Sequence, residues 1–275
     1  MKKFFITLAV MTVAMFAANA EEKTKTYDFG DIRSLDIGYM YEVVVTEGKS
    51  DEVKVVYDSK LEDYLKISYN ADSHCLNASI KDNLPKILKT GQLPRMKVYL
   101  EMDMIADLDI SGAASVTFKG QFKSNEAEIE LSGASKLSGL ELNGKSLDFS
   151  CSGASKGTVT GDFSEDVDIE LSGASKASYN GNCKNLNIEI SGASKIDMEG
   201  STDNAEYECS GASKIEAKRM VAKDAMVSLS GASSADVHAT SNLTYSVSRA
   251  CRITYYGDAK LKNVSPENNV VKGRL

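Results

Sequence analysis

The sequence contains few of the residues that mark common catalytic sites. It has no tryptophan, three prolines and two histidines, His74 and His238, in 275 residues. Neither histidine has an evident triad setting, and the abundant serines lie in SGASK segments, which we do not interpret as nucleophile elbows. The composition therefore argues against a serine hydrolase.

Cysteine is scarce, and its spacing excludes the usual zinc pattern because no CxxC pair occurs. The five cysteines are Cys75, Cys151, Cys183, Cys209 and Cys251. Cys151 and Cys209 take equivalent places in a repeat, three copies apart. In a stack of strands about 4.8 Å apart they lie too far from each other for a disulfide. We expect small, buried, apolar side chains.

Positive charge is also in deficit, since 32 Lys and Arg face 39 Asp and Glu, for a formal charge of −7. This balance disfavours binding to nucleic acid or to an anionic membrane.

The one long apolar run lies in the opening MKKFFITLAVMTVAMFAANA. Two lysines, a run shorter than the ~20 residues of a membrane span and a small-residue ending predict a signal peptide over residues 1–20. Its loss would move the formal charge to −9, and no cysteine follows for lipid attachment. We expect an exported protein without a transmembrane segment, located in the periplasm, at the cell surface or outside the cell.

One pentapeptide is abundant. SGASK starts at Ser132, Ser152, Ser172, Ser191 and Ser210, and related copies start at Ser111, Ser230 and Ser248. Successive starts are 21, 20, 20, 19, 19, 20 and 18 residues apart. A period near twenty over eight copies indicates a solenoid.

Strict two-residue alternation precedes each copy, as in AEIEL and LNIEI, and a shorter alternation follows, as in KIDMEG. This pattern is typical of strands with one buried face. The expected inward residues are Ile129, Leu131, Phe149, Cys151, Ile169, Leu171, Ile188, Ile190, Tyr207, Cys209, Ile196, Met198, Ile215, Ala217, Ala235 and Val237. Since no coil can bury its apolar stripe alone, the sequence predicts an all-β, single-chain parallel β-helix of about 20 residues per coil. We expect a right-handed winding, from the handedness of parallel crossovers.

The SGA step is interpreted as the corner between two strands, where glycine permits a positive φ. The corner glycines are Gly112, Gly133, Gly153, Gly173, Gly192, Gly211 and Gly231. We expect Ala134 and its equivalents to pack inside the bend and the serines to form hydrogen-bonded ladders. Arg249 replaces the last glycine, which predicts an opened or terminal corner.

The domain prediction is a signal peptide over residues 1–20, one β-helical domain over 25–260 and a tail or cap over 261–275. Residues 26–105 read as an irregular, β-rich part that covers an open strand edge. Within them, NLPKILKTGQLPR predicts a protruding loop.

The opening DFGDIRSLDIGYMYEVVVTEG, then LDISGAASV and the repeated LSGASK, resemble the bacterial GIN-domain family of auto-transporter adhesin head domains. The resemblance covers roughly residues 25–260. It implies a β-helical fold and an envelope or surface role, and it supplies no catalytic or ligand residues.

Three columns of outward charge follow from the repeat. The acidic columns are Asp107, Glu128, Asp148, Asp168 and Glu206, and then Asp109, Glu130, Glu170, Glu189 and Glu208. Stacked carboxylates raise one another's pKa or attract cations, so calcium is one interpretation; we favour a solvated face because no calcium-repeat motif occurs. The basic column is Lys136, Lys156, Lys176, Lys195 and Lys214. It either binds an acidic polysaccharide or neutralises the acidic columns across the bend, and we favour neutralisation.

The sequence therefore predicts a non-catalytic surface protein of adhesin type, with no cofactor, whose flat repetitive face binds glycans or cell-surface proteins. A polysaccharide-active, lyase-like enzyme and a purely structural envelope protein are the alternatives. The candidate residues for the enzyme are Arg219, Arg249, Arg252, Asp224 and Asp236. The central coils are too regular for a catalytic cleft, which argues against it.

Overall fold

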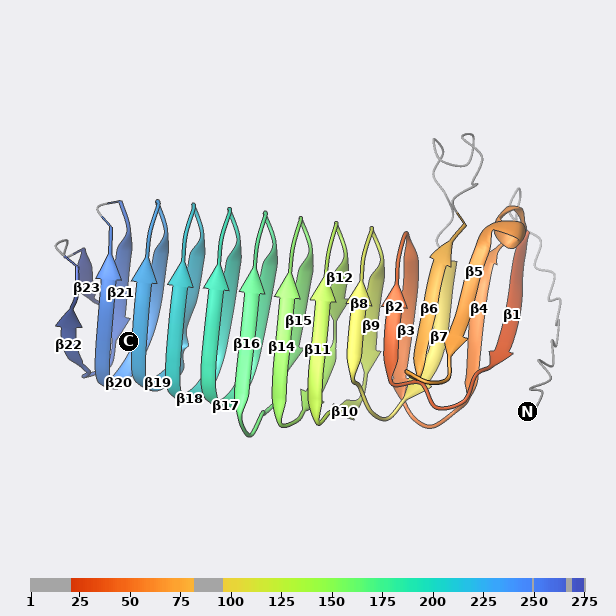
Figure 1. Cartoon of the computed structure of the whole chain (residues 1–275), viewed down its shortest axis with the longest axis horizontal. Coiled ribbons are helices and arrows are strands. Elements are labelled where there is room, and N and C mark those ends of the chain that lie inside the picture. Colours follow the sequence, from red (N-terminus) through yellow and green to blue (C-terminus); the bar gives the residue numbers. More distant parts are fainter. Residues whose placement is uncertain (1–20, 82–95, 249, 266–268, 275) are drawn as a thin grey trace.

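The computed structural model describes residues 21–81, 96–248, 250–265 and 269–274, and most of their strands wind into one parallel solenoid (Figure 1). The predicted β-helix is confirmed. Residues 1–20, the loop predicted within 82–95 and Arg249 lie outside the described residues. No helix in the described ranges is long and apolar enough to cross a membrane.

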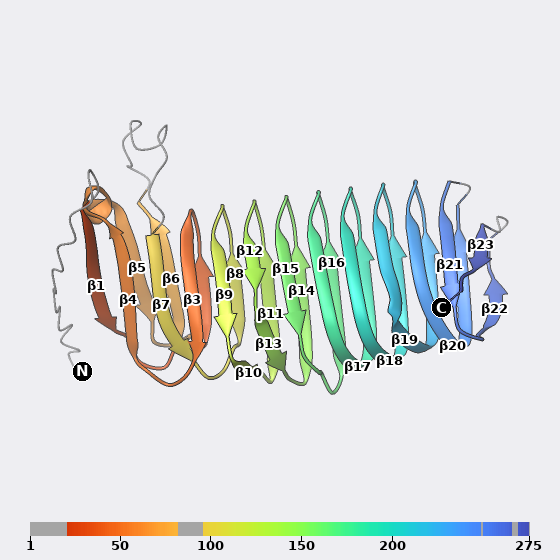
Figure 2. The ribbon, with the colours of Figure 1, turned by 180° about the vertical axis from the view of Figure 1, so that it is seen from behind.

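Each coil has one strand before its corner and one after it, so the solenoid has two walls (Figure 2). The wall before the corners, here the carboxylate wall, contains β6 (Cys75–Ile80), β2 (Ser34–Ile37), β8 (Asp107–Ile110), β11 (Glu126–Leu131), β14 (Ser146–Cys151) and β16 (Asp166–Leu171). The wall after the corners, here the lysine wall, contains β7 (Met96–Met102), β3 (Tyr41–Glu47), β9 (Ser115–Lys119), β12 (Lys136–Ser138) and β15 (Lys156–Thr160).

A second bend, opposite the corners, leads from the lysine wall to the carboxylate wall of the next coil. β10 (Gln121–Lys123) and β13 (Leu140–Asn143) pair with each other in this region. Four long strands begin in the lysine wall and end in the carboxylate wall: β17 (Lys176–Ile190), β18 (Lys195–Cys209), β19 (Lys214–Leu229) and β20 (Ser234–Val247).

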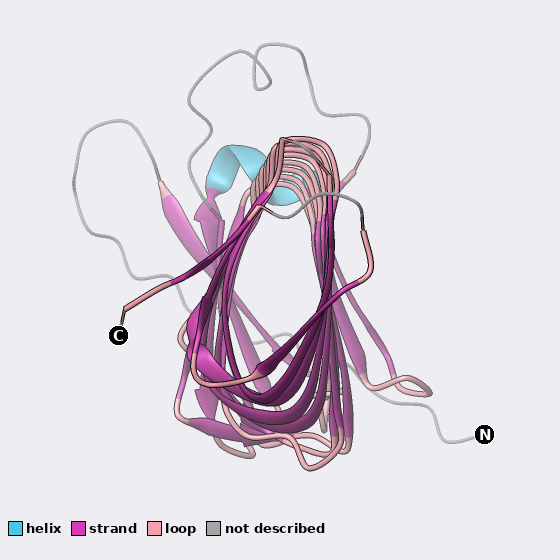
Figure 3. Cartoon of the chain, turned by 90° about the vertical axis from the view of Figure 1, so that its left-hand side faces the viewer, coloured by secondary structure: helices cyan, strands magenta, loops and turns pink. Residues whose placement is uncertain are grey.

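The coils stack in nearly constant register. On the lysine wall Lys136 pairs with Lys156 and Lys156 with Lys176, whereas on the carboxylate wall Ile129 pairs with Phe149. Viewed along the axis, the two walls and the corner turns superpose from coil to coil (Figure 3). An outward side chain therefore has the equivalent side chain of the next coil about 4.8 Å away.

The first 80 residues contain a regular coil that the sequence did not reveal. β2 and β3 pair in parallel with β8 and β9 and turn at Tyr39, whose φ is 64°. This coil lies between the β8–β9 coil and the β6–β7 coil, although β6 and β7 come later in the chain than β3.

Antiparallel strands close the N-terminal end of the stack, as the predicted covering of an open edge requires. β1 (Glu22–Asp28) pairs with β4 (Glu52–Asp58), which pairs with β7, and β5 (Leu65–Asn70) pairs with β6. A short 3-10 helix, Ser59–Tyr64, joins β4 to β5.

At the other end β21 (Arg252–Tyr256) continues the lysine wall and pairs with β23 (Val270–Lys272). β22 (Lys260–Asn263) continues the carboxylate wall. Both walls thus extend into the predicted tail, residues 261–275.

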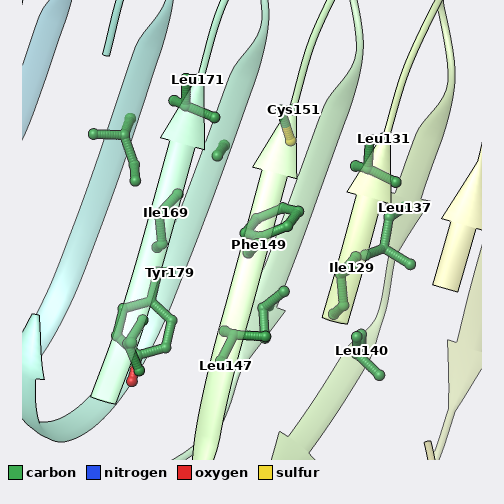
Figure 4. Close-up of a cluster of buried hydrophobic side chains, with 14 of the residues drawn as sticks. Ile129, Leu131, Leu137, Leu140, Leu147, Phe149, Cys151, Ile169, Leu171 and Tyr179 are labelled. Carbon is green, nitrogen blue, oxygen red and sulfur yellow. The ribbon is translucent and has the colours of Figure 1, made fainter. Parts of the chain in front are cut away.

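The interior is one apolar stack, and every predicted inward residue is buried. Figure 4 shows Ile129, Phe149 and Ile169 pointing inward from consecutive strands. Four of the five unpaired cysteines are buried, and Cys75 is partly exposed.

The corners stack through their backbones. The seven corner glycines have φ between 68° and 75°, and each corner alanine donates to the previous corner, as Ala154 N does to Gly133 O at 2.7 Å. The expectation that Ala134 packs inside the bend is wrong, because Ala134 is exposed and Ser135 is buried. After the turn, Ser135 is the first residue whose side chain points inward again. The second serine of each pentapeptide therefore fills the bend.

The buried corner serines form part of the ladder that was expected, although Ser135 Oγ has no hydrogen-bond partner among the described residues. Ser175 Oγ lies 3.2 Å from Ser194 Oγ, and Ser155 Oγ donates to Leu131 O at 3.3 Å. The ladder joins neighbouring coils inside the corner edge.

Candidate binding faces

The first acidic column lies on the carboxylate wall, where Glu128 pairs with Asp107 on one side and Asp148 on the other. Burial, followed by repulsion from neighbouring carboxylates, raises the pKa of Glu128 and of Asp148 above their usual values. The column is interrupted, because Asn187 and Met226 take the equivalent places in later coils.

The second acidic column borders a shallow groove of about 380 Å³ beside the corners. Glu170, Glu189 and Glu208 line it together with corner serines such as Ser172 and Ser191. Among the described residues no three His, Cys, Asp or Glu side chains are placed to hold a metal ion. The groove is therefore a polar furrow in an acidic face.

A wider groove of about 720 Å³ lies further along the same wall and was not predicted. It contains an amide ladder in which Asn185 donates to Asp166 at 2.7 Å and Asn204 donates to Asn185 at 2.9 Å. Met226, 47% exposed, lies in the same groove. Asparagine at one repeat position is the sequence signal that points to this ladder.

The five lysines form an unbroken column on the opposite wall, each paired with its equivalent on the next coil. At the C-terminal end of the column, Lys195 and Lys214 contact Glu216 at 2.7 and 2.5 Å. Hydrogen bonds from these two ammonium groups lower the pKa of Glu216 to about 2. This neutralisation comes from the same wall, and not from across the bend as the sequence suggested.

The other three members of the lysine column, Lys136, Lys156 and Lys176, differ from this pair. They are exposed, and within the described part of the chain none of them forms an ion pair. Two residues further along each strand, where β19 has Glu216, these coils have small hydroxyl side chains. We call Thr117, Ser138, Thr158 and Ser178 the hydroxyl column. The N-terminal part of the lysine column thus combines positive charge that forms no ion pair with a described residue and a neighbouring row of hydroxyls.

The residues suggested for an enzyme do not converge. Asp224 lies on the carboxylate wall and accepts from Asn242 at 2.6 Å, whereas Asp236 and Arg252 lie on the lysine wall. Arg219 pairs with Asp197 and Glu199, both at 3.3 Å.

One corner, GASKG over residues 153–157, matches the letters of a GxSxG elbow. Its Ser155 is 1% exposed and donates to a backbone carbonyl, and β15 follows it in place of a helix. A nucleophile elbow needs an exposed serine between a strand and a helix, so this match is structural.

Comparison with known proteins agrees with the fold. A family model described as "Putative auto-transporter adhesin, head GIN domain" matches residues 33–177 and 162–259. No curated protein matches the chain.

Three solved structures share the architecture. A putative adhesin from Parabacteroides distasonis ATCC 8503 is 18% identical, with 92% of this chain and 97% of that chain covered and a TM-score of 0.67. A putative adhesin from Parabacteroides merdae ATCC 43184 is 17% identical, with 92% and 96% covered and a TM-score of 0.67. A putative lipid binding protein from Parabacteroides distasonis ATCC 8503 is 18% identical, with 92% and 97% covered and a TM-score of 0.65. At such identities the likeness shows the fold alone, whereas the family match spans most of the sequence. The chain belongs to the GIN-domain family of auto-transporter adhesin head domains.

Proposed function

We propose that this protein is an exported, non-catalytic surface adhesin that binds acidic polysaccharides through its lysine wall. One observation carries the proposal: Lys136, Lys156 and Lys176 stack one coil apart and form no ion pair with any described residue, whereas Glu216 pairs with both Lys195 and Lys214. Uncompensated surface charge of one sign attracts a partner of the opposite sign.

The spacing of the column favours a polymer with regularly placed anions. Neighbouring coils lie about 4.8 Å apart, which is close to the advance of one sugar unit in an extended polysaccharide. A chain of uronate sugars laid across the strands would place carboxylates along the lysine column. The adjacent hydroxyl column supplies donors and acceptors for sugar hydroxyls.

The experiment is titration of polygalacturonate in EDTA-containing buffer, with fully methyl-esterified homogalacturonan as the uncharged counterpart. The variant carries Lys136→Gln, Lys156→Gln and Lys176→Gln. Three exposed ionic contacts predict a loss of affinity of roughly tenfold, which should shrink as salt is raised. Binding of the methyl ester should be weak for both proteins.

The matched control carries Lys123→Gln, Lys145→Gln and Lys184→Gln, which change the net charge equally at exposed positions near the other bend. It should bind polygalacturonate like the parent protein. If both triple variants lost affinity equally, net charge alone would explain the effect, and the proposal that the lysine column is the binding site would be wrong.

Export is the other half of the proposal, and cell fractionation tests it. The mature protein should appear in the periplasmic, surface or extracellular fraction and begin at Glu21. A cytoplasmic protein that retains Met1 would contradict the proposed location.

A further inference from the structure

We propose that the polysaccharide lies along the solenoid axis and that Tyr99 is the ring on which one of its sugars stacks. This inference rests on the proposed function and adds an aromatic residue, a direction and a minimum ligand length to it.

The strand register places Tyr99 in line with the hydroxyl column. Tyr99 on β7 pairs with Val44 on β3, and Val44 pairs with Thr117 on β9. Thr117 then pairs with Ser138 on β12. The line continues through β15 to Ser178 on β17, so that five strand spacings, roughly 24 Å, separate Tyr99 from Ser178. A straight polymer that crosses the lysines at right angles to the strands reaches Tyr99.

Tyr99 has the exposure that a stacking platform needs. Its side chain is 39% exposed, whereas most large apolar side chains of the described residues are buried. Val44, the next residue in line, is partly exposed. An amphipathic tyrosine offers an apolar ring face to the C–H face of a sugar and a hydroxyl to its polar edge. Tyr99 and Val44 therefore form a short apolar segment at the N-terminal end of the hydroxyl column.

The charges around Tyr99 divide the proposed ligand path into a part at the three lysines and a part at Tyr99. Lys97 and Lys54 lie beside the ring, but Glu101 follows on β7 and Glu42 takes the lysine-column position on β3. The lysine column begins only at β12, so sugar carboxylates at β12, β15 and β17 lie near Lys136, Lys156 and Lys176. The lysines thus bind the carboxylates of the ligand, and stacking on Tyr99 binds the sugars that extend past β9.

Ligand length separates these two parts. An oligogalacturonate of three units covers only the three lysine coils, whereas one of six units also covers β9, β3 and β7. Tyr99→Ala should leave trimer affinity unchanged and weaken hexamer affinity about fivefold, as loss of one aromatic contact predicts. Tyr99→Phe should retain hexamer affinity.

Circular dichroism and the melting temperature of each variant check that the fold is kept. Isothermal titration of trimer and hexamer at one salt concentration gives all the affinities needed.

The outcomes distinguish this inference from the proposed function. If the triple lysine variant loses binding but Tyr99→Ala binds the hexamer normally, the axial path ending at Tyr99 is wrong and the lysine site stands. Equal weakening of trimer and hexamer by Tyr99→Ala also overturns the path. If neither variant changes any affinity, the lysine site itself is wrong.

Discussion

At the scale of single residues, the corner glycines are required by two constraints at once. Gly173 has φ +72°, and a Cβ added there would lie 2.6 Å from the carbonyl oxygen of Gly153. Gly173→Val must therefore strain its own backbone and separate two stacked corners. We expect the free energy of unfolding to fall by about 2 kcal/mol or more, measured by urea denaturation.

Ala174→Val is the matched control, because it adds a β-branched side chain one residue later at an exposed position. It should change the unfolding free energy by less than about 0.5 kcal/mol. Equal destabilisation by both variants would show that added bulk anywhere in the corner lowers stability, and that the positive φ of Gly173 is not the cause.

Two-residue alternation predicted the inward residues of the strands correctly because successive side chains of a strand point to opposite faces. The expectation that Ala134 fills the bend came from its place in the SGA corner, and it was wrong because Ser135 is the buried residue there. Alternation also missed the second stack of glycines: a Cβ at Gly181 would lie 1.8 Å from the carbonyl oxygen of Gly161. These glycines belong to no SGASK copy. The close approach of neighbouring coils, which the sequence does not show, explains why no side chain fits there.

At the scale of strands, Glu216 on β19 is the link between the lysines of two coils. Its pKa is lowered to about 2, so its carboxylate stabilises the folded state above the unfolded pKa of about 4.5, and this stabilisation is lost as the pH falls toward 2. Glu216→Gln should therefore cost roughly 1 kcal/mol at pH 7, after allowance for solvent screening, and nothing near pH 2. Chemical denaturation of both proteins across this pH range measures the difference.

Asp236→Asn controls for this prediction, because Asp236 takes the same place as Glu216 on the next coil. Its effect on the unfolding free energy at pH 7 should be smaller than that of Glu216→Gln. A pH-independent difference between the parent protein and Glu216→Gln would show that packing, and not charge, makes Glu216 important.

The order of the first coils could not be predicted from the repeat. The β2–β3 corner reads IGYMY and lacks the pentapeptide, and Tyr39 adopts the positive φ that glycine adopts elsewhere. Strands β4 to β7 then fold back outside this coil, as a pairing between distant segments. The periodicity of the sequence predicts strands and corners within one coil. The order of the coils depends on which strands pair although they are far apart in the sequence, and the periodicity does not show that.

At the scale of the whole molecule, the repeat predicts the scaffold and the departures from it define the candidate site. A column of five identical lysines indicates a basic strip but not which part of it is free. Glu216 decides that question, because it pairs with Lys195 and Lys214, and it does not belong to the SGASK pattern. The acidic columns show the same limit, because Asn187 and Met226 interrupt what the spacing alone presents as continuous.

The ends of the solenoid matter because stacked strands leave an unpaired edge at each end. β1 covers the edge of β4 in antiparallel register, with Tyr27 opposite Val53 and Lys25 opposite Val55. A protein that starts at Phe29 would expose β4, a seven-residue edge strand with three buried valines, Val53, Val55 and Val56. Such an edge can pair with another molecule, so we expect concentration-dependent self-association, measured by size-exclusion chromatography with light scattering.

Thr26→Ser in the mature protein is the control, since it leaves β1 paired with β4 and should have the same molar mass in solution as the parent protein at every concentration. Loss of β1 should also lower stability. The side chains of Val53 and Val55 point to the interior, and without β1 the backbone edge of β4 and part of these side chains would be exposed to water. If the shortened protein kept the molar mass and the melting temperature of the parent protein, β4 alone would be a sufficient cap and β1 would not be needed to cover the edge.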